Sequence, residues 1–203
     1  MELVVNGCRI RPMARLEGVD RLAGESLEGV DLSRASLNRS ILERTILARS
    51  KMTGASLVRT NLRFADLSGA DLKYADLSRA DLTGANLSDA NLYKVRMSHA
   101  CLRGANLTGA QLNSAQCAHV DFAGAVLRRA NLSGTVATEA TFIDADLVDV
   151  DLGGGVFIGA DFRGTSIVVA NWKDAEFLNA KLPTKEDIPP ISHPDTDPEA
   201  TTR

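Results

Sequence analysis

The sequence predicts an all-β solenoid from about Asp20 to Leu182, in which the chain turns a corner every five residues. The first observation is a period of five that does not slip. Of the 33 positions reached in steps of five from Leu22 to Leu182, 31 hold Leu, Phe, Met, Ile or Trp. The second is a small residue two positions before each centre, where Ala fills 20 of 33 positions from Asp20 to Ala180. The third is that five of the six prolines lie after Leu182, and the other is Pro12.

These observations exclude the common regular elements. A period of five fits neither an α-helix, with 3.6 residues per turn, nor a flat strand, with a period of two. Two apolar residues that lie two positions apart share one side of a short extended segment, so both can point inward. The three residues between successive pairs then supply the corner and the exterior. Because proline lacks an N–H group, its absence from residues 20–182 leaves the backbone free to pair with neighbouring coils.

Units such as residues 65–69 (ADLSG) and 85–89 (ANLSD) show the repeat intact. This A-[DN]-L-x-x pattern resembles the pentapeptide-repeat proteins, and the resemblance covers roughly 80% of the chain. It implies a right-handed quadrilateral parallel β-helix with four repeats per coil and about eight coils. Leucine-rich repeats need a period of 20 or more, so they do not fit.

The chain divides into three predicted parts. Residues 1–19 are expected to form an N-terminal cap, because the exposed end of a solenoid must be covered. Residues 20–182 form the β-helix, with Trp172 and Phe177 expected to enlarge the core just before the rod stops. Residues 183–203 are proline-rich, acidic and free of the repeat, which predicts a disordered tail.

The composition argues against two classes of partner, nucleic acid and membranes. The net charge of −3 gives no reason to expect nucleic acid, which needs a strongly basic face. No apolar run approaches the roughly 18 residues of a membrane span, so no membrane contact is expected. Three cysteines without CxxC spacing indicate a reducing compartment, and we expect a cytoplasmic location.

We expect no catalytic, cofactor or metal site. A column of Asp and Asn at 20-residue spacing is better explained by turn formation than by acid–base chemistry. His99 and His119 are also 20 residues apart, but zinc needs three or four ligands. Cys101 has no histidine in its own segment to activate it.

Two surface features are informative. Arg39, Arg59 and Arg79 stack at 20-residue spacing in the basic N-terminal half, which either serves ordinary solubility or attracts an anionic partner. Apolar residues at outward positions gather on the same face, two to five coils further on. They indicate either an interface or β-branched residues that simply suit a strand edge, and they are Val136, Val156, Ile158 and Leu178.

The sequence therefore predicts a non-enzymatic protein-interaction scaffold with an unidentified protein partner, and with homodimerisation through the C-terminal coils as a further interaction. The resemblance implies an alternative, because some pentapeptide-repeat proteins mimic DNA, bind type II topoisomerases such as DNA gyrase and confer resistance to quinolones. Those proteins are strongly acidic along the rod and dimerise through a C-terminal helix. This sequence departs from both features, since residues 1–60 carry ten Lys and Arg against seven Asp and Glu, and a proline-rich tail ends the chain.

Overall fold

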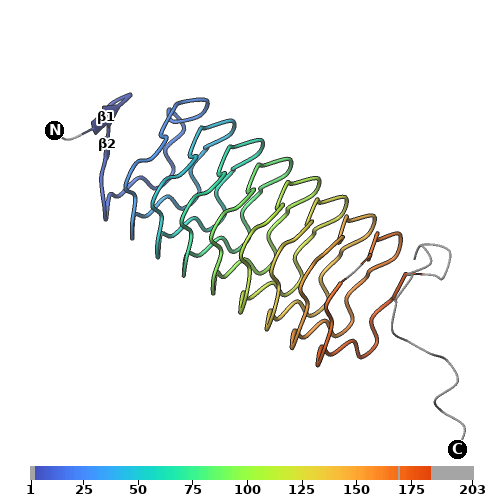
Figure 1. The fold of residues 1–203 in the computed structure, drawn as a ribbon. Helices are drawn as coiled ribbons and strands as arrows, with labels where there is room; N and C mark the ends of the chain where they lie inside the picture. Colours follow the sequence, from blue (N-terminus) through green and yellow to red (C-terminus); the bar gives the residue numbers. More distant parts are fainter. Residues whose placement is uncertain (1–2, 169, 184–203) are drawn as a thin grey trace, which may run out of the picture.

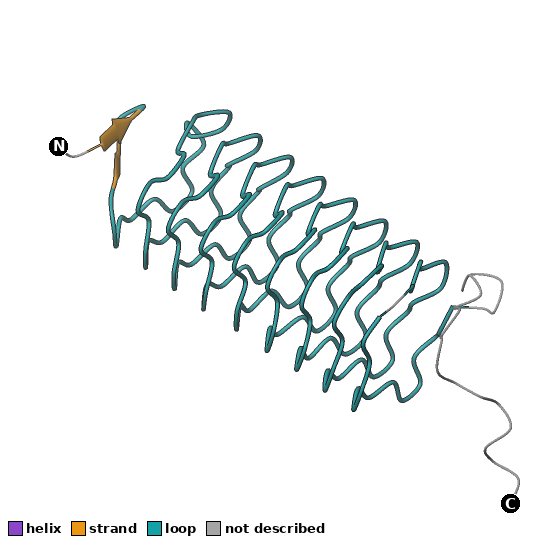
Figure 2. Ribbon diagram, viewed as in Figure 1, coloured by secondary structure: helices purple, strands orange, loops and turns teal. Residues whose placement is uncertain are grey.

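The computed structural model describes residues 3–168 and 170–183, which wind into a rod of stacked coils (Figure 1). The chain enters through an antiparallel hairpin of β1 (Leu3–Val5) and β2 (Cys8–Ile10). Asn6 and Gly7 form its turn with positive φ values of 47° and 75°, as two-residue hairpin turns of this kind require. Beyond this hairpin, the described residues contain no helix and pair only through isolated bridges (Figure 2).

Parallel bridges join residues 20 positions apart, such as Asp66 with Asn86 and Asn86 with Asn106. The five-residue unit therefore repeats four times before the chain returns to the same side. This confirms the right-handed quadrilateral parallel β-helix of the pentapeptide-repeat type. Steps of 20 residues from Leu22 to Leu182 make about eight coils, and a strand spacing of about 4.8 Å gives them a length of roughly 38 Å.

The leucine period marks the interior of the rod. Every centre position from Leu22 to Ile167 is buried, and Leu87 in mid-rod is 0% exposed. The small residues two positions earlier fill the space beside these centres. Where such a residue is threonine, its hydroxyl donates to a main-chain carbonyl, in most cases one of the neighbouring coil, as from Thr45 Oγ1 to the Leu22 oxygen at 2.8 Å. The narrow core therefore tolerates threonine hydroxyl groups, because each has a main-chain acceptor, whereas the buried Ser50 hydroxyl has no hydrogen-bond partner in the described part of the chain.

Each corner is a four-residue turn whose third residue has a positive φ. In one such turn the Ala90 N–H donates to the Leu87 carbonyl at 3.0 Å, and Asp89 has a φ of 56°. This is the geometry of a type II turn. All described residues at this position from Gly24 to Asn179 share it, including many that are not glycine. Hydrogen bonds to the next coil hold these strained residues in place, as from the Asp89 N–H to the Thr108 carbonyl at 2.9 Å.

The ladder begins before the predicted boundary at residue 20. Arg15 pairs with Ser36, 21 positions away, and Leu16 is buried. Six residues rather than five separate Leu16 from the next inward centre, Leu22, so one additional residue lies in this unit. The segment 1–19 therefore holds the hairpin and the start of the first coil.

The last coil keeps the five-residue repeat, but the side chains at its centre positions are not buried. Trp172 and Leu182 occupy centre positions, yet they are 45% and 53% exposed. The prediction that Trp172 enlarges the buried core is wrong, because no described coil covers it. Phe177 is half-buried and stacks on Phe157 with 5.3 Å between ring centroids. The predicted tail lies outside the described residues from position 184 onward.

Candidate interaction face

Three predicted interaction residues, Arg39, Arg59 and Arg79, form a column that we call the arginine ridge. Bridges from Ser36 to Ser56 and from Ser56 to residue 76 stack the strands that precede them. The three side chains therefore lie on successive coils, whose backbones are about 4.8 Å apart. All three occupy the third turn position, with φ values of 57°, 58° and 59°, and all three are exposed.

The ridge arginines make no ion pair within residues 3–168 and 170–183. An open groove of about 730 Å³ runs beside them, lined also by Glu17, Gly18, Asn38, Val58 and Ser78. Because like charges at this spacing repel one another, an anion in the groove would be attracted and would also relieve that repulsion.

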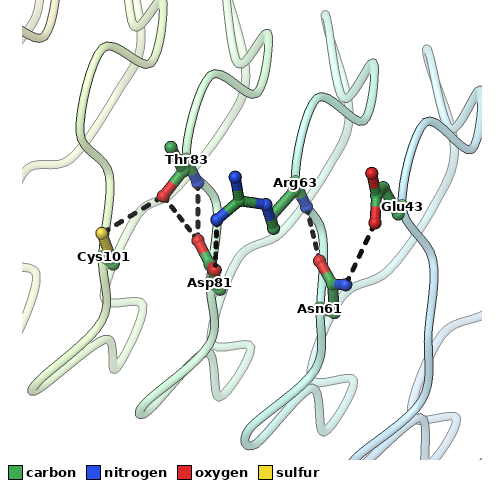
Figure 3. A network of polar contacts seen from close by, with 6 residues as sticks. All are labelled: Glu43, Asn61, Arg63, Asp81, Thr83 and Cys101. Carbon is green, nitrogen blue, oxygen red and sulfur yellow. Dashed lines mark hydrogen bonds and ion pairs between the residues drawn. The ribbon is translucent and has the colours of Figure 1, made fainter.

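Several other arginines of the rod pair with a carboxylate, as Figure 3 shows for Arg63. Its Nη1 lies 3.2 Å from Asp81 Oδ2 on the next coil, and its main-chain N–H donates to Asn61 Oδ1 at 3.0 Å. Partial burial tends to raise the pKa of Asp81, but hydrogen bonds from Thr83 and Arg63 outweigh it and leave that pKa lowered. This network links adjacent coils. Because the Asp81 carboxylate is already paired within it, we assign the network a structural role.

The column of the ridge continues into two histidines. His99 and His119 stack with 4.7 Å between ring centroids and an interplanar angle of 5°. His119 Nδ1 lies 3.3 Å from Glu139 Oε2 on the following coil. In the described part of the chain, no group of three or more His, Cys, Asp or Glu side chains is placed to hold a metal ion.

Further along the same face lie Val136, Val156, Ile158 and Leu178, which we call the apolar patch. Bridges from residue 116 to Val136 and from Val136 to Val156 place these strands in line with those of the ridge. Leu178 is 66% exposed, and the other three side chains are half-buried. The structure thus brings all seven predicted residues onto one face, with the ridge toward the N-terminal end and the patch toward the C-terminal end.

Sequence reasoning missed an exposed aromatic site on a different corner. Phe64 is 47% exposed, and the guanidinium carbons of Arg44 and Arg63 each lie 5.5 Å from its ring centroid. The sequence did contain a signal for this site, because Phe64 is the one phenylalanine outside the centre positions of the repeat. Tyr74, also exposed, packs edge-on against Tyr93 with 5.7 Å between centroids.

The environments of Cys117 and Cys101 do not favour a reactive thiolate. Cys117 occupies a centre position, and burial raises the pKa of its thiol, which keeps it protonated. Cys101 is half-exposed, and its Sγ lies 3.3 Å from Thr83 Oγ1. Among the described residues, neither thiol has the histidine partner that activates a cysteine nucleophile.

A model of the family described as pentapeptide repeats matches eight copies within residues 26–63, 60–98, 70–109, 90–127 and 115–154. No curated protein matches the chain in sequence. No helix long and apolar enough to cross a membrane occurs in the described residues.

Two solved structures illustrate the likeness. HetL of the cyanobacterium Nostoc sp. strain PCC 7120, which is involved in regulating heterocyst differentiation, is 28% identical over 84% of this chain and 90% of its own, with a TM-score of 0.41. A trypsin-treated variant of QnrB1, a plasmid-mediated fluoroquinolone resistance protein, is 15% identical over 85% of this chain and 88% of its own, with a TM-score of 0.54. At that identity, QnrB1 shares the fold alone.

Proposed function

Because the chain belongs to the pentapeptide-repeat family, we propose that it is a non-enzymatic scaffold that binds a protein partner through the arginine ridge and the apolar patch. The observation that carries this proposal is the unpaired charge of the ridge on the same face as exposed apolar side chains. Apolar residues that gather on one face favour an interface. Unpaired charge beside them adds specificity and faster association. A continuous core beneath holds these side chains at fixed spacing.

The alternative implied by the family is a DNA mimic that protects gyrase. A mimic needs a continuous negative face, whereas several aspartates on this rod are paired with arginines, as in Asp121 with Arg103 at 3.0 Å and Asp161 with Arg163 at 2.7 Å. The ridge adds unpaired positive charge. We therefore favour the scaffold, and we expect no protection of gyrase from quinolones in a supercoiling assay at stoichiometric protein.

The partner-binding role is testable by affinity capture from the native organism with matched variants. Arg59→Glu and Ile158→Lys alter the proposed face. Arg129→Glu and Val148→Lys make the same chemical changes on another side of the rod. A partner that is retained by the two controls and lost with the two face variants supports the proposal. A partner lost equally with all four variants, or with none, contradicts it.

The open C-terminal end supports a second interaction, a homodimer. Trp172 and Leu182 expose apolar surface there, and within the described residues the N–H groups of Trp172 and Phe177 donate no hydrogen bond. An uncovered strand edge beside apolar side chains favours association. We propose that two rods meet through these coils.

We also propose a cytoplasmic location. Cys8, Cys101 and Cys117 are all free, and two of them are buried. Free thiols are typical of proteins in reducing compartments.

A further inference from the structure

The candidate face has a chemical direction along the rod. From the C-terminal end it presents Leu178, then Ile158 and Val156, and beyond the histidines the three arginines of the ridge. In the described part of the chain, Glu17 is the one carboxylate that lines the ridge groove. An occupant that matches this face must be apolar at the end nearer Leu178 and acidic at the end nearer Arg39.

The sequence that follows Pro183 has this order. It places Ile188 and Ile191 first, separated by two prolines, and then Asp195, Asp197 and Glu199. The three carboxylates alternate with other residues, so an extended backbone would present them on one side.

The segment after Pro183 starts near this face and is long enough to reach the arginine ridge. Pro183 lies four residues beyond the corner residue Asn179, which belongs to the same column as Arg39 and Arg79. Five coils separate Asn179 from Arg79 and seven separate it from Arg39, which correspond to roughly 24 and 34 Å. Twelve residues from Pro183 to Asp195 span at most about 40 Å, and the segment can therefore reach the ridge.

We propose that residues 184–203 bind back onto this face of their own chain, with Ile188 and Ile191 on the apolar patch and Asp195, Asp197 and Glu199 along the arginine ridge. Carboxylates there neutralise arginines that have no ion-pair partner within residues 3–168 and 170–183, and they remove the mutual repulsion of these arginines. Attachment at Pro183 makes the contact intramolecular, so even weak pairing gives substantial occupancy. A protein partner for this face must then displace the segment.

The test uses the full chain and ¹⁵N relaxation of the amides of Asp195, Asp197 and Glu199. A bound segment is expected to give order parameters approaching 0.85, the value for rigid backbone. With Arg59→Glu and Arg79→Glu together, the values should fall below about 0.6, which marks flexible backbone. Arg129→Glu is the matched control, because it changes an exposed arginine on a different corner, and it should leave the values unchanged.

Reversing the charges on both sides distinguishes a loss of specific ion pairing from a general disturbance of the fold. Asp195→Arg and Asp197→Arg, added to the doubly substituted ridge, should restore the high order parameters. The same low values in the wild-type chain and all variants would overturn the proposal. High values that fall on dilution would also overturn it, because the segment would then come from a second copy.

Discussion

The five positions of each repeat unit lie in different environments, and the inward positions accept few kinds of side chain. The centre and the small residue before it point into the core, and the third turn residue adopts a positive φ. Leu87 shows the first role and Asp89 the last. Neighbouring residues in the sequence therefore have very different sensitivities to substitution.

Leu87→Ala should lower the free energy of unfolding by about 2–5 kcal/mol, because leucines of adjacent coils would wall a cavity that cannot easily collapse. Ser88→Lys should change it by less than about 0.5 kcal/mol. Ser88 faces outward, and Arg128 occupies the same column two coils on. Denaturant unfolding measures both. Equal losses for the two variants would show that the inside–outside assignment is wrong.

Gly84 and Gly104 occupy one corner column with φ values of 66° and 61°, but only a Cβ at Gly84 would meet the ring of Phe64, at 2.6 Å. Gly104→Ala should cost about 1–2 kcal/mol through backbone strain alone. Gly84→Ala should cost about 0.5–1 kcal/mol more, because the ring must leave its two arginines. Thermal or denaturant unfolding in a Phe64→Ala background provides the control. The excess should vanish there, and its persistence would contradict the explanation.

At the scale of the element, several ion pairs tie one coil to the next. Near the C-terminal end Arg163 Nη2 lies 2.7 Å from Asp161 Oδ2, and Lys181 Nζ lies 3.4 Å from the same oxygen. Hydrogen bonding from Arg163 is the main reason that the pKa of Asp161 falls to about 2. Asp161 thus joins the last coil to the one before.

Arg163→Met should therefore destabilise the protein at neutral pH. The folded-state pKa of Asp161 lies below its unfolded value of about 3.9, so this contribution is fully present above about pH 3.9. It disappears as the pH falls through about 2. The difference between wild type and Arg163→Met in denaturant unfolding should shrink over that window. Arg129→Met should show no such pH-dependent difference, and a constant deficit for Arg163→Met would argue against the pair.

The elements were largely predictable, and the reasons differ by position. A strict leucine period predicts which residues lie inside, and the structure confirms it from Leu22 to Ile167. The unit between Leu16 and Leu22 escaped detection because one additional residue breaks the period while its hydrogen bonds persist.

Charge pairing was not predictable. Sequence spacing stacks Arg59 and Arg63 equally well, but only Arg63 has a carboxylate within reach on the neighbouring coil. Which arginines remain unpaired depends on side-chain directions at the corners, and the repeat does not specify these. The exposure of Trp172 likewise depends on what lies beyond the last coil.

At the scale of the whole molecule, the two ends of the rod differ. A hairpin joins the first coil, whereas Trp172 and Leu182 remain exposed at the other end. If two rods associate there, the aromatic side chain should dominate the contact, as large buried aromatics do in interfaces.

Trp172→Glu should weaken self-association by at least about tenfold in sedimentation equilibrium, because a desolvated charge would face its own copy. Tyr74→Glu changes another exposed aromatic, on the side of the rod, and should have no effect. A wild-type chain that remains monomeric at high concentration would contradict the proposed dimer.

The 20-residue coil makes position along the sequence equivalent to an angle around the rod. Removal of 20 residues between Arg79 and Val136 would shorten the distance between ridge and patch by one coil and keep them on the same side. Removal of only five would turn everything beyond the deletion by a quarter of a revolution. The patch would then face a different direction from the ridge, although every side chain of both survived. In this protein the relative orientation of two surfaces is set by a residue count, and small in-frame deletions can change binding geometry without touching a binding residue.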